Sequence, residues 1–571
     1  MKKTTSILVI ILLFFAGCSE SESVDLIVHN AKIYTVNSLF ETAEAMVIKD
    51  GKIIAIGAEH QIMNRYYSPN TVDARKRPIY PGFIDAHCHF VGYALNLKQV
   101  NLVGTKSFDE VLERVAAFAK ENKSEWIIGR GWDQNDWEIK EFPNRFKLDS
   151  LFPNQPVFLT RIDGHAAIAN KTALKLANIN SETKVKGGIL TSTFIPDGDL
   201  SWTNKKLQDE VVHLNYPAWE PTGILIDNAV DIVKNIIPQP SKKELTAALL
   251  AAQNNLFKVG LTTVDDAGLT KDTIDLIDQL QQDNLLKIKV YAMISGNSEQ
   301  LSYYLKKGPY KTDKLTVNSF KFYADGALGS RGALLLEPYA DRVEQEHHGL
   351  WVTPMDSLQK YAPMLYEKGF QMNTHCIGDA ANQQVLTLYS EVLKTTNDKR
   401  WRIEHAQVIA PADFDFFKNF NIIPSVQPTH ATSDMYWAKD RLGKNRVQNA
   451  YAYLKLLQQN GLIALGTDFP IEGISPISTF YAAVVRKDNK GFPDKGYQIK
   501  NALSKEEALK GMTIWAAIAN FEENEKGSLE IGKSADFVIL DNDIMQTKDE
   551  NILSIKVLQT FINGENVFTQ D

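Results

Sequence analysis

Two histidines stand one residue apart at the end of an apolar run, in YPGFIDAHCHF, residues 80–90. Histidine nitrogens bind transition metals, so a His-x-His pair at a strand end can supply half of a metal site. Side chains alternate along a strand, which places His87 and His89 on one face and Cys88 on the other. We therefore expect the histidines to face a binding site and Cys88 to pack among apolar neighbours. A structural Cys/His cluster and an accident of composition are the alternatives.

Four further residues of metal-binding or titratable type stand at or near the ends of other apolar runs. Lys321 lies in SFKFYADG, His375 ends FQMNTH, His405 lies in WRIEHA and Asp468 in LIALGTDFP. Taken singly, each has a plain structural alternative, such as a lysine on a strand edge or an aspartate that caps a helix. Brought to one place, four imidazoles and one carboxylate suit a divalent metal, with Zn²⁺ favoured.

These residues lie on eight apolar runs that alternate with amphipathic helical stretches. The runs have the content of buried strands, and they begin near Ile79, Gly260, Lys287, Val317, Phe370, Trp401, Ile422 and Leu462. Eight strands with intervening helices predict an α/β fold of the (β/α)8 TIM-like barrel type, whose active site lies at the carboxyl ends of the strands. Strands one and five are on opposite sides of such a barrel, so we expect no disulfide between Cys88 and Cys376.

The chain is longer than a barrel requires, and the surplus falls in two places. Residues 96–241, between the first two predicted strands, form an insertion that we expect to cover the barrel mouth. Residues 24–78 and 525–571 are short and strand-like, with the turn dipeptides Asp50-Gly51 and Asn563-Gly564 between apolar runs. We expect these two ends to build one small β-sandwich beside a barrel of residues 79–524.

The composition is that of a globular protein without a nucleic-acid-binding surface. The 571 residues include 62 basic and 69 acidic ones, which gives a net charge of −7. No basic patch is concentrated enough for nucleic-acid binding, so that class of partner is excluded.

The N-terminus has the pattern of an export signal. A basic start, an apolar stretch and small residues predict a signal peptide over residues 1–17. The segment Phe15-Ala16-Gly17-Cys18 resembles a bacterial lipobox, which implies a lipid on Cys18; a plain secretory signal is the alternative. We expect an exported protein anchored to a bacterial membrane through this lipid alone, because no later apolar run could span a bilayer. The membrane face, periplasmic or cell-surface, and a homodimeric state are left open.

Seven motifs occur in an order that resembles a known family: PGFIDAHCH, DGHAAIANKTAL, KFYADGALGSRGA, THCIGDAA, RIEHAQ, SVQPTHATSD and GTDFPIE. Together with KGSLEIGKSADFVILD near the end, they resemble the amidohydrolase superfamily and, within it, the YtcJ-like (amidohydrolase 3) enzymes, which include N-substituted formamide deformylase. The resemblance covers the chain after the signal peptide. It implies two metal sites joined by a carboxylated lysine: His87, His89 and Asp468 at the first, His375 and His405 at the second, and Lys321 between them. A single-metal site with an unmodified Lys321 is the alternative.

The residues and the resemblance together predict a hydrolase that acts on carbon–nitrogen bonds other than peptide bonds. Metal-activated hydroxide would attack the carbonyl of an amide, N-acyl or formamide group in a small molecule. Asp468 would accept the proton of the water and pass it to the leaving nitrogen. The alternatives are a metal-dependent esterase or phosphotriesterase-like hydrolase and a non-catalytic, ligand-binding surface lipoprotein.

Five residues outside the metal set are candidate substrate contacts, each with a structural alternative. His165, in RIDGHAAIAN, could hold the carbonyl oxygen or belong to a surface turn. Trp132 and Asp133, in GRGWDQNDW, could form a pocket wall or pack in a core. His430 could point inward after strand seven or cap a loop, and Arg331, in GALGSRGA, could pair with an anionic substrate group.

Overall fold

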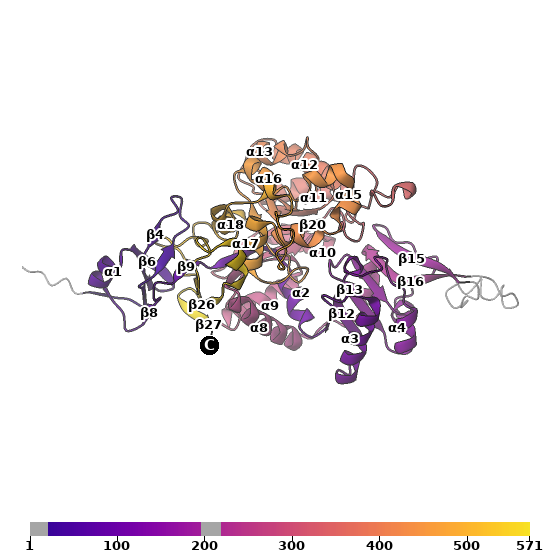
Figure 1. Cartoon of the computed structure of the whole chain (residues 1–571), viewed down its shortest axis with the longest axis horizontal. Coiled ribbons are helices and arrows are strands. Elements are labelled where there is room, and N and C mark those ends of the chain that lie inside the picture. Colours follow the sequence, from indigo (N-terminus) through magenta and orange to yellow (C-terminus); the bar gives the residue numbers. More distant parts are fainter. Residues whose placement is uncertain (1–20, 196–217, 571) are drawn as a thin grey trace, which may run out of the picture.

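The centre of the molecule is a barrel of eight parallel strands that follow one another in chain order. The computed structural model describes residues 21–195 and 218–570 (Figure 1). The barrel strands are β10 (Phe83–Cys88), β17 (Leu261–Leu269), β18 (Lys289–Ser295), β20 (Leu315–Tyr323), β21 (Gln371–Cys376), β22 (Arg402–His405), β23 (Ile423–Val426) and β24 (Ala464–Leu465). A short strand, β19 (Tyr310–Lys311), pairs antiparallel with β20.

Main-chain hydrogen bonds beyond β24 bring the two ends of this strand path together. The Asp468 amide donates to the His87 carbonyl at 2.8 Å, and the His89 amide donates to the Phe469 carbonyl at 2.8 Å. The first and last strands therefore meet at their carboxyl ends. The TIM-like barrel predicted from the sequence is confirmed.

Helices cover the outside of the barrel, and the strands are accordingly buried on both faces. Every residue of β10 and of β21 is buried. The helices are α2 (Phe90–Asn96), α8 (Lys242–Lys258), α9 (Lys271–Gln282), α10 (Ser298–Lys307), α11 (Met355–Lys368), α12 (Asp379–Leu393), α13 (Asp415–Asn419), α14 (Pro428–Asp434), α15 (Ala438–Arg446), α16 (Tyr453–Asn460), α17 (Pro476–Val485), α18 (Lys505–Gly511) and α19 (Ile514–Ala519). Local signals set their ends: α8 begins in a capping box between Ser241 and Glu244, and α11 ends at Gly369, whose φ is 77°.

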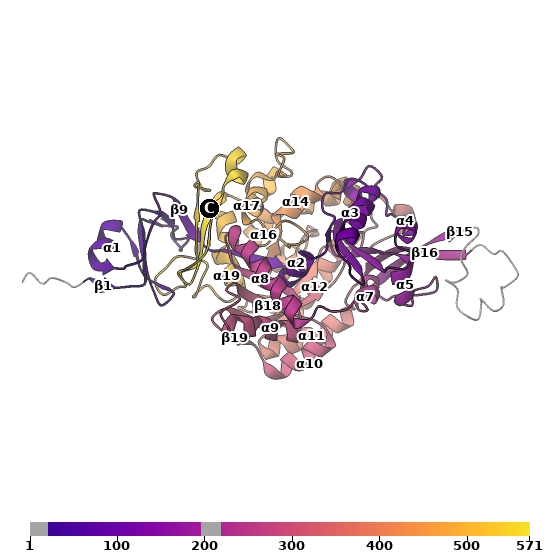
Figure 2. The ribbon, with the colours of Figure 1, turned by 90° about the horizontal axis from the view of Figure 1, so that it is seen from below.

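The insertion has its own six-stranded sheet, in the order β11-β12-β13-β14-β16-β15. Its elements are β11 (Val100–Asn101), α3 (Phe108–Glu121), β12 (Ile127–Trp132), α4 (Phe146–Leu151), β13 (Val157–Arg161), β14 (Ala166–Ala169), α5 (Lys171–Leu176), β15 (Gly188–Ile195), β16 (Ala218–Asp227) and α7 (Asn228–Lys234). Along the long axis of the molecule the insertion lies at one end, the barrel in the middle and the terminal strands at the other end (Figures 1 and 2).

Strands from the two termini share one sheet. Its order is β27-β26-β25-β9-β3-β4, and a separate sheet, β6-β5-β2-β8, is formed by N-terminal strands alone. The strands are β2 (Leu26–His29), β3 (Lys32–Tyr34), β4 (Thr42–Ala43), β5 (Ala45–Lys49), β6 (Lys52–Gly57), β8 (Thr71–Asp73), β9 (Pro78–Pro81), β25 (Phe537–Leu540), β26 (Val557–Ile562) and β27 (Glu565–Thr569); β1 (Glu22–Ser23), α1 (Glu59–Arg65) and β7 (Tyr66–Tyr67) lie beside them. The sandwich and the domain boundaries stay predictions, whereas the composite sheet is observed.

The predicted turn dipeptides connect the expected hairpins. Asp50 and Gly51, with φ of 51° and 73°, join β5 to β6, and Asn563 and Gly564, with φ of 49° and 74°, join β26 to β27. Positive φ at both positions is the backbone that tight hairpins require and that Asn-Gly and Asp-Gly adopt readily.

The run predicted to be the first barrel strand is in fact two strands separated by Gly82. The part before it, β9, pairs with β3 and β25 in the composite sheet, and only the part after it, β10, enters the barrel. A Cβ at position 82 would lie 2.3 Å from Thr262 Oγ1 on the neighbouring strand. Glycine thus permits the close approach at which the chain passes from one sheet to the other.

One carboxylate ties the composite sheet to the segment that follows β25. Asp543 accepts hydrogen bonds from Lys32 Nζ, Tyr34 Oη and Tyr80 Oη, each at 2.8 Å. Burial opposes ionisation of Asp543, but the hydrogen bonds from these three donors outweigh it and lower the pKa of the carboxyl. The two ends of the chain are therefore held together by charge-assisted hydrogen bonds as well as by strand pairing.

Cys88 and Cys376 are free, buried thiols within the apolar core of the barrel.

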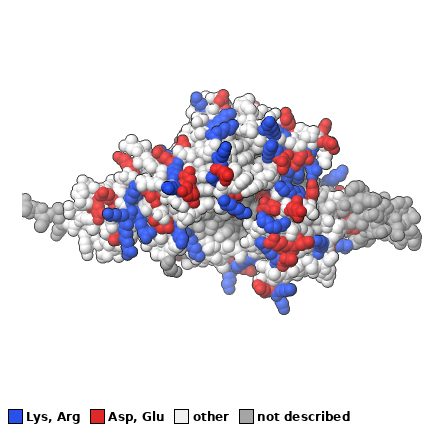
Figure 3. Space-filling model, viewed as in Figure 1, with Lys and Arg blue, Asp and Glu red and all other residues white. Residues whose placement is uncertain are grey.

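The predicted signal peptide and Cys18 lie outside the described residues. Among the residues that are described, no helix has the length and apolar character needed to cross a lipid bilayer. On the face seen in Figure 3, basic and acidic side chains are interspersed.

Candidate metal centre

The residues predicted to bind metal stand at the carboxyl ends of five barrel strands. They come from β10, β20, β21, β22 and the segment after β24: His87, His89, Lys321, His375, His405 and Asp468. His89 is the residue that precedes α2, one position beyond the end of β10. Their common position at the barrel mouth follows from the parallel arrangement of the strands, which brings all carboxyl ends to one side.

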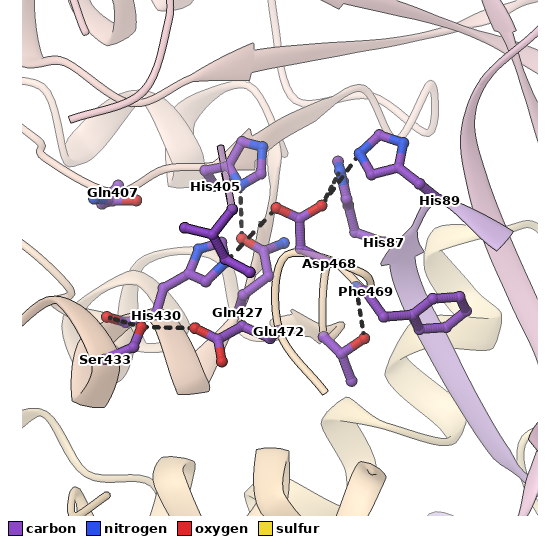
Figure 4. A network of polar contacts seen from close by, with 12 residues as sticks. His87, His89, His405, Gln407, Gln427, His430, Ser433, Asp468, Phe469 and Glu472 are labelled. Atoms are coloured by element: carbon purple, nitrogen blue, oxygen red, sulfur yellow. Dashed lines mark hydrogen bonds and ion pairs between the residues drawn. The ribbon is translucent and has the colours of Figure 1, made fainter. Parts of the chain in front are cut away.

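Three of these side chains form a compact group. One ligand atom each of His87, His405 and Asp468 lies within 4.8 Å of the others, and all three residues are buried. Asp468 Oδ1 is 3.2 Å from His89 Nε2 and 3.6 Å from His87 Nε2 (Figure 4). The His375 ring lies beside this group, with its centroid 4.5 Å from that of His405.

Two of the histidines are oriented by side chains on neighbouring strands. His87 Nδ1 is 2.5 Å from Glu404 Oε2, and His405 Nδ1 is 2.7 Å from Gln427 Oε1. Burial opposes ionisation of Glu404, but its interactions with His87 and Arg402 lower its pKa, so the carboxylate accepts and His87 Nδ1–H donates. The amide oxygen of Gln427 likewise accepts from His405. The Nε2 lone pair of each imidazole is then available for a ligand.

The other two histidines are oriented by main-chain carbonyl groups. His89 Nδ1 donates to the Ala267 carbonyl at 3.0 Å, and His375 Nε2 donates to the Gly326 carbonyl at 3.4 Å. A carbonyl oxygen can only accept, so these bonds fix which nitrogen carries the hydrogen. His89 Nε2 and His375 Nδ1 remain as lone-pair donors.

The charge states of these residues suit a cation. Burial lowers the pKa of His89 to about 4 and lowers those of His375 and His405 well below the usual range, so these imidazoles are neutral near pH 7. Burial opposes ionisation of Asp468, but the imidazoles around it act more strongly and lower the pKa of its carboxyl. Neutral imidazole and ionised carboxylate are the forms that bind metal.

Lys321 lies among these groups rather than at a strand edge. Its side chain is buried on β20, and Nζ is 3.1 Å from His87 Nε2 and 4.7 Å from the centre of the Tyr323 ring. Burial lowers the pKa of this amine to about 8, against the opposing effect of Glu404 and Asp468. A lysine with this pKa is partly neutral near pH 7, the form that can react with carbon dioxide.

The residues therefore fit a divalent metal. Asp468 Oδ1 is buried and has no hydrogen-bond donor among the described residues. Its nearest neighbours are the Nε2 atoms of His89 and His87, at 3.2 and 3.6 Å, and all three atoms can act as ligands to a cation placed between them. His87, His405 and Asp468 would hold the metal, with His89, His375 and Lys321 within reach of the same group.

A cavity of about 250 Å³ opens directly above this centre. His89, Lys321, His375, His405 and Asp468 line it from the barrel. This volume is at the small end of known ligand pockets, so it suits a small molecule.

Three of the five predicted substrate contacts also line the cavity: His165, Asp133 and His430. His165 comes from the insertion, and its Nδ1 is 2.7 Å from Asp227 Oδ1; its ring centroid lies 5.0 Å from that of His375. His430 Nε2 is 3.6 Å from Asp468 Oδ2 (Figure 4).

The other two predicted contacts, Trp132 and Arg331, are not in the cavity wall. Trp132 is buried in the apolar core of the insertion, where its indole nitrogen donates to the Leu159 carbonyl at 2.8 Å. Arg331 pairs with Asp341, with 2.8 Å between Nη2 and Oδ2. Core packing and this ion pair account for the two side chains, and the structure places neither of them at the cavity, contrary to the predicted positions.

Sequence reasoning missed Glu404, Gln427 and Asp227, which orient His87, His405 and His165. Two signals were present in the sequence: Glu404 precedes His405 in RIEHAQ, and Gln427 lies three residues before His430 in QPTH. A buried polar residue beside a ligand histidine is a candidate partner for the other ring nitrogen. Asp227 has no comparable signal, because 62 residues separate it from His165.

Comparisons with known proteins agree with this geometry. The profile of the Amidohydrolase family matches residues 70–193 and 196–568. The protein LONG AFTER FAR-RED 3 of Arabidopsis thaliana is 32% identical over 562 residues, which are 95% of this chain and 91% of that protein. The YtcJ protein of Bacillus subtilis (strain 168) is 30% identical over 95% of this chain and 98% of its own length.

Two further similar proteins are named for a hydrolytic activity. N-substituted formamide deformylase of Arthrobacter pascens is 24% identical over 95% of this chain and 97% of its own length. The crystal structure of a metal-dependent hydrolase from Pyrococcus horikoshii OT3 superposes with a TM-score of 0.72 at 27% identity, over 92% of this chain and 99% of that one. With the family profile matched along most of its length, this chain belongs to the amidohydrolase family.

Proposed function

We propose that this metal-dependent amidohydrolase cleaves a carbon–nitrogen bond other than a peptide bond, in a small N-acyl amine, formamide or cyclic amide. The observation that carries the proposal is the site itself, where four imidazoles and an ionised carboxylate converge below a small cavity. The 24% identity to N-substituted formamide deformylase supports this choice of bond.

The chemistry needs a bound metal for two purposes. When present, a divalent ion such as Zn²⁺ makes a water molecule acidic and polarises a carbonyl group. Asp468 then serves as the proton carrier: its carboxylate takes a proton from the attacking water and returns it to the departing nitrogen. The reaction consumes one amide and one water and yields a carboxylic acid and an amine.

His165 is placed to act on the substrate rather than on the water. Asp227 holds its Nδ1, so its Nε2 is free to contact a substrate oxygen in the cavity. Burial lowers the pKa of His165, but its hydrogen bond to Asp227 and nearby carboxylates outweigh this and raise it above the usual value. An imidazole of this kind can donate a hydrogen bond to the oxygen on which negative charge develops.

A carboxylated Lys321 is part of the proposal, because a bridging carbamate would allow two metal ions. The number of metal ions bound per chain distinguishes this two-metal proposal from the single-metal alternative. Protein prepared in ¹³C-bicarbonate should show a carbamate carbon signal that disappears in Lys321→Ala. Absence of that signal in metal-loaded protein would support one ion and an unmodified lysine.

We also propose that the protein is exported and held at a bacterial membrane by a lipid on Cys18. The lipobox-like segment at residues 15–18 supports this. Cells labelled with a palmitate analogue should yield labelled protein, and Cys18→Ala should release unlabelled protein from the membrane fraction. Labelling that persists in Cys18→Ala would refute the assignment.

The substrate proposal is tested by turnover of a small-molecule panel. Zn²⁺-loaded protein is offered N-formyl, N-acetyl and longer N-acyl amines, together with esters and phosphotriesters. We expect amine release from at least one amide, and a 10²- to 10⁴-fold loss of kcat in Asp468→Asn, the range for loss of a general acid–base group. Cleavage of esters or phosphotriesters alone would replace the proposed bond, and no turnover at all would favour a binding protein.

A further inference from the structure

The outer wall of the cavity carries far more acid than base. Beyond the metal centre, five carboxylates line it against a single guanidinium: Asp133, Asp136, Asp163, Asp434 and Glu472 against Arg161. Such a wall favours one class of ligand through its charge alone, provided that the carboxylates are not already neutralised by neighbouring bases.

The arginine is fully committed to two of these carboxylates. Arg161 is 1% exposed; its Nη1 is 2.6 Å from Asp163 Oδ2, and its Nη2 pairs with Asp133. Its Nε donates to Gln134 Oε1 at 2.8 Å. Each nitrogen of Arg161 thus has a partner within the wall, and two carboxylates share its single positive charge.

The remaining carboxylates have no basic partner within ion-pair distance in the described part of the chain. Two of them, Asp434 and Glu472, are joined through one hydroxyl. Ser433 Oγ is 2.6 Å from Glu472 Oε1 (Figure 4). The same oxygen is 3.5 Å from Asp434 Oδ1. Asp434 Oδ2 accepts from Tyr451 Oη at 2.8 Å and from Gln407 Nε2 at 3.3 Å. Neutral donors hold both groups, and no cation separates them.

The electrostatics of this pair favour an added positive charge. Burial raises the pKa of Asp434 to about 7; His430 and the hydrogen bond from Tyr451 oppose this effect, and the charge of Glu472 adds to it. Burial likewise raises the pKa of Glu472, opposed by His430 and Ser433 and assisted by Asp468 and Asp136. Two carboxylates that resist ionisation side by side are stabilised when a cation lies between them.

An independent observation points to a ligand in the same space. His430 is 8% exposed and lines the cavity, and its Nε2 has no hydrogen-bond partner among the described residues. A buried ring nitrogen without a partner costs free energy unless something polar binds there. Its Nε2 is 3.6 Å from Asp468 Oδ2, and the ring lies between Asp468 and the Ser433–Glu472 contact (Figure 4).

We infer that the substrate carries a cationic group, a protonated amine or a guanidinium, which Asp434 and Glu472 bind while the scissile amide lies over the metal centre. The inference rests on the proposed function and narrows it to amides of diamines and related cationic amines.

A second explanation is that the acids merely balance the charge of bound metal. If so, removing an acid should weaken metal binding, and the protein should bind charged and uncharged substrates equally well. Substrate pairs that differ only in charge therefore separate the two explanations.

Binding is measured first, on the metal-loaded protein with a pair of methanesulfonamides that it cannot hydrolyse. One carries a 5-ammoniopentyl group and the other a hexyl group, so the two match in length and differ in charge. Calorimetry should show binding of the cationic compound at least 10-fold tighter, a preference that falls to about 2-fold or less in Glu472→Gln and in Asp434→Asn. Asp440→Asn, on the exposed face of α15, should retain it.

Turnover is measured next with the two corresponding formamides, as a ratio of kcat/KM that is insensitive to the fraction of folded variant. We expect the same preference and the same losses. Equal binding of the two sulfonamides, or metal affinity reduced in Glu472→Gln with the preference intact, overturns the inference. Preferential binding of the cationic compound without cleavage of any amide upholds the cation site and refutes the proposed function instead.

Discussion

Replacing Glu404 with glutamine should weaken metal binding while leaving the barrel folded. The carboxylate is 2.5 Å from His87 Nδ1, fully buried, and its second oxygen has no hydrogen-bond donor among the described residues. Glutamine has the same shape and still offers an oxygen to Nδ1–H, so the imidazole keeps its orientation. What is lost is the charge that makes Nε2 a stronger ligand.

The magnitude follows from the kind of hydrogen bond that is exchanged. A bond to a charged acceptor contributes about 1.5–3 kcal/mol and a neutral one about 1 kcal/mol, so the difference is about 0.5–2 kcal/mol. That corresponds to roughly a 2- to 30-fold rise in the Kd for Zn²⁺, which overlaps the range of about 10–100-fold for groups that orient metal-bound histidines.

The assay is competition for Zn²⁺ with a chromophoric chelator at fixed pH. Glu522→Gln is the matched control: it also removes a buried carboxylate, one whose Oε2 is 3.0 Å from Lys526 Nζ and which also accepts from Thr316, near the start of β20. The control should lower thermal stability and leave the Kd unchanged. An affinity within 2-fold of wild type in Glu404→Gln, or an equal loss in the control, would show that this carboxylate does not tune the site.

Three further predictions concern the metal and the fold. Removal of metal with a chelator should lower the melting temperature, and Zn²⁺ should restore it, because binding to the folded chain alone stabilises it; an unchanged melting curve would contradict the site. Asp543→Asn should lower the free energy of unfolding by about 1.5–3 kcal/mol at pH 7. Since the pKa of Asp543 is lowered on folding, its contribution is present above pH ~4 and fades as the pH falls below that, so the difference from wild type in urea unfolding should shrink in acid and not in base. Gly82→Ala should cost about 1–3 kcal/mol by its clash with Thr262, and Thr262→Ala in the same chain should recover part of it; an additive loss in the double variant would exclude the contact.

The barrel was predictable because its sequence pattern repeats. Eight buried runs separated by amphipathic helices leave few alternatives to a TIM-like barrel, and parallel strands bring their carboxyl ends to one side whatever the details of packing. The convergence of His87, His375 and His405 therefore follows from strand order alone. The break between β9 and β10 at Gly82 could not be predicted, because the apolar run continues across it. The two parts pair with different strands, β25 and β17, which lie far along the chain.

Glu404 could not be found by strand parity. In a regular strand the side chains of Glu404 and His405 would point to opposite faces. If His405 faces the metal site, Glu404 is then expected to point away from it. In the structure the chain leaves regular strand geometry there, with φ of 74° at His405 and 41° at Ala406. This turn brings the His405 ring to the mouth while Glu404 stays in the barrel interior, and both end in the same site.

Residues of the insertion were the least predictable. Trp132 and Asp133 are adjacent in sequence, yet the first enters the core of the insertion and the second turns to Arg161 at the cavity. Which of two neighbours faces the substrate depends on where β12 ends, and strand ends are the part of a fold that sequence patterns define least well.

The composite sheet sets an order of events during synthesis. β9 pairs with β3 on one side and with β25 on the other, and β25 leaves the ribosome roughly 450 residues later, or roughly 20 to 90 seconds at bacterial rates of elongation. Throughout that delay one edge of β9 is open, the kind of surface on which other chains aggregate. A nonsense codon shortly before residue 537 would spare every metal-binding residue, yet we would expect its product to be recovered as insoluble material rather than as an active enzyme.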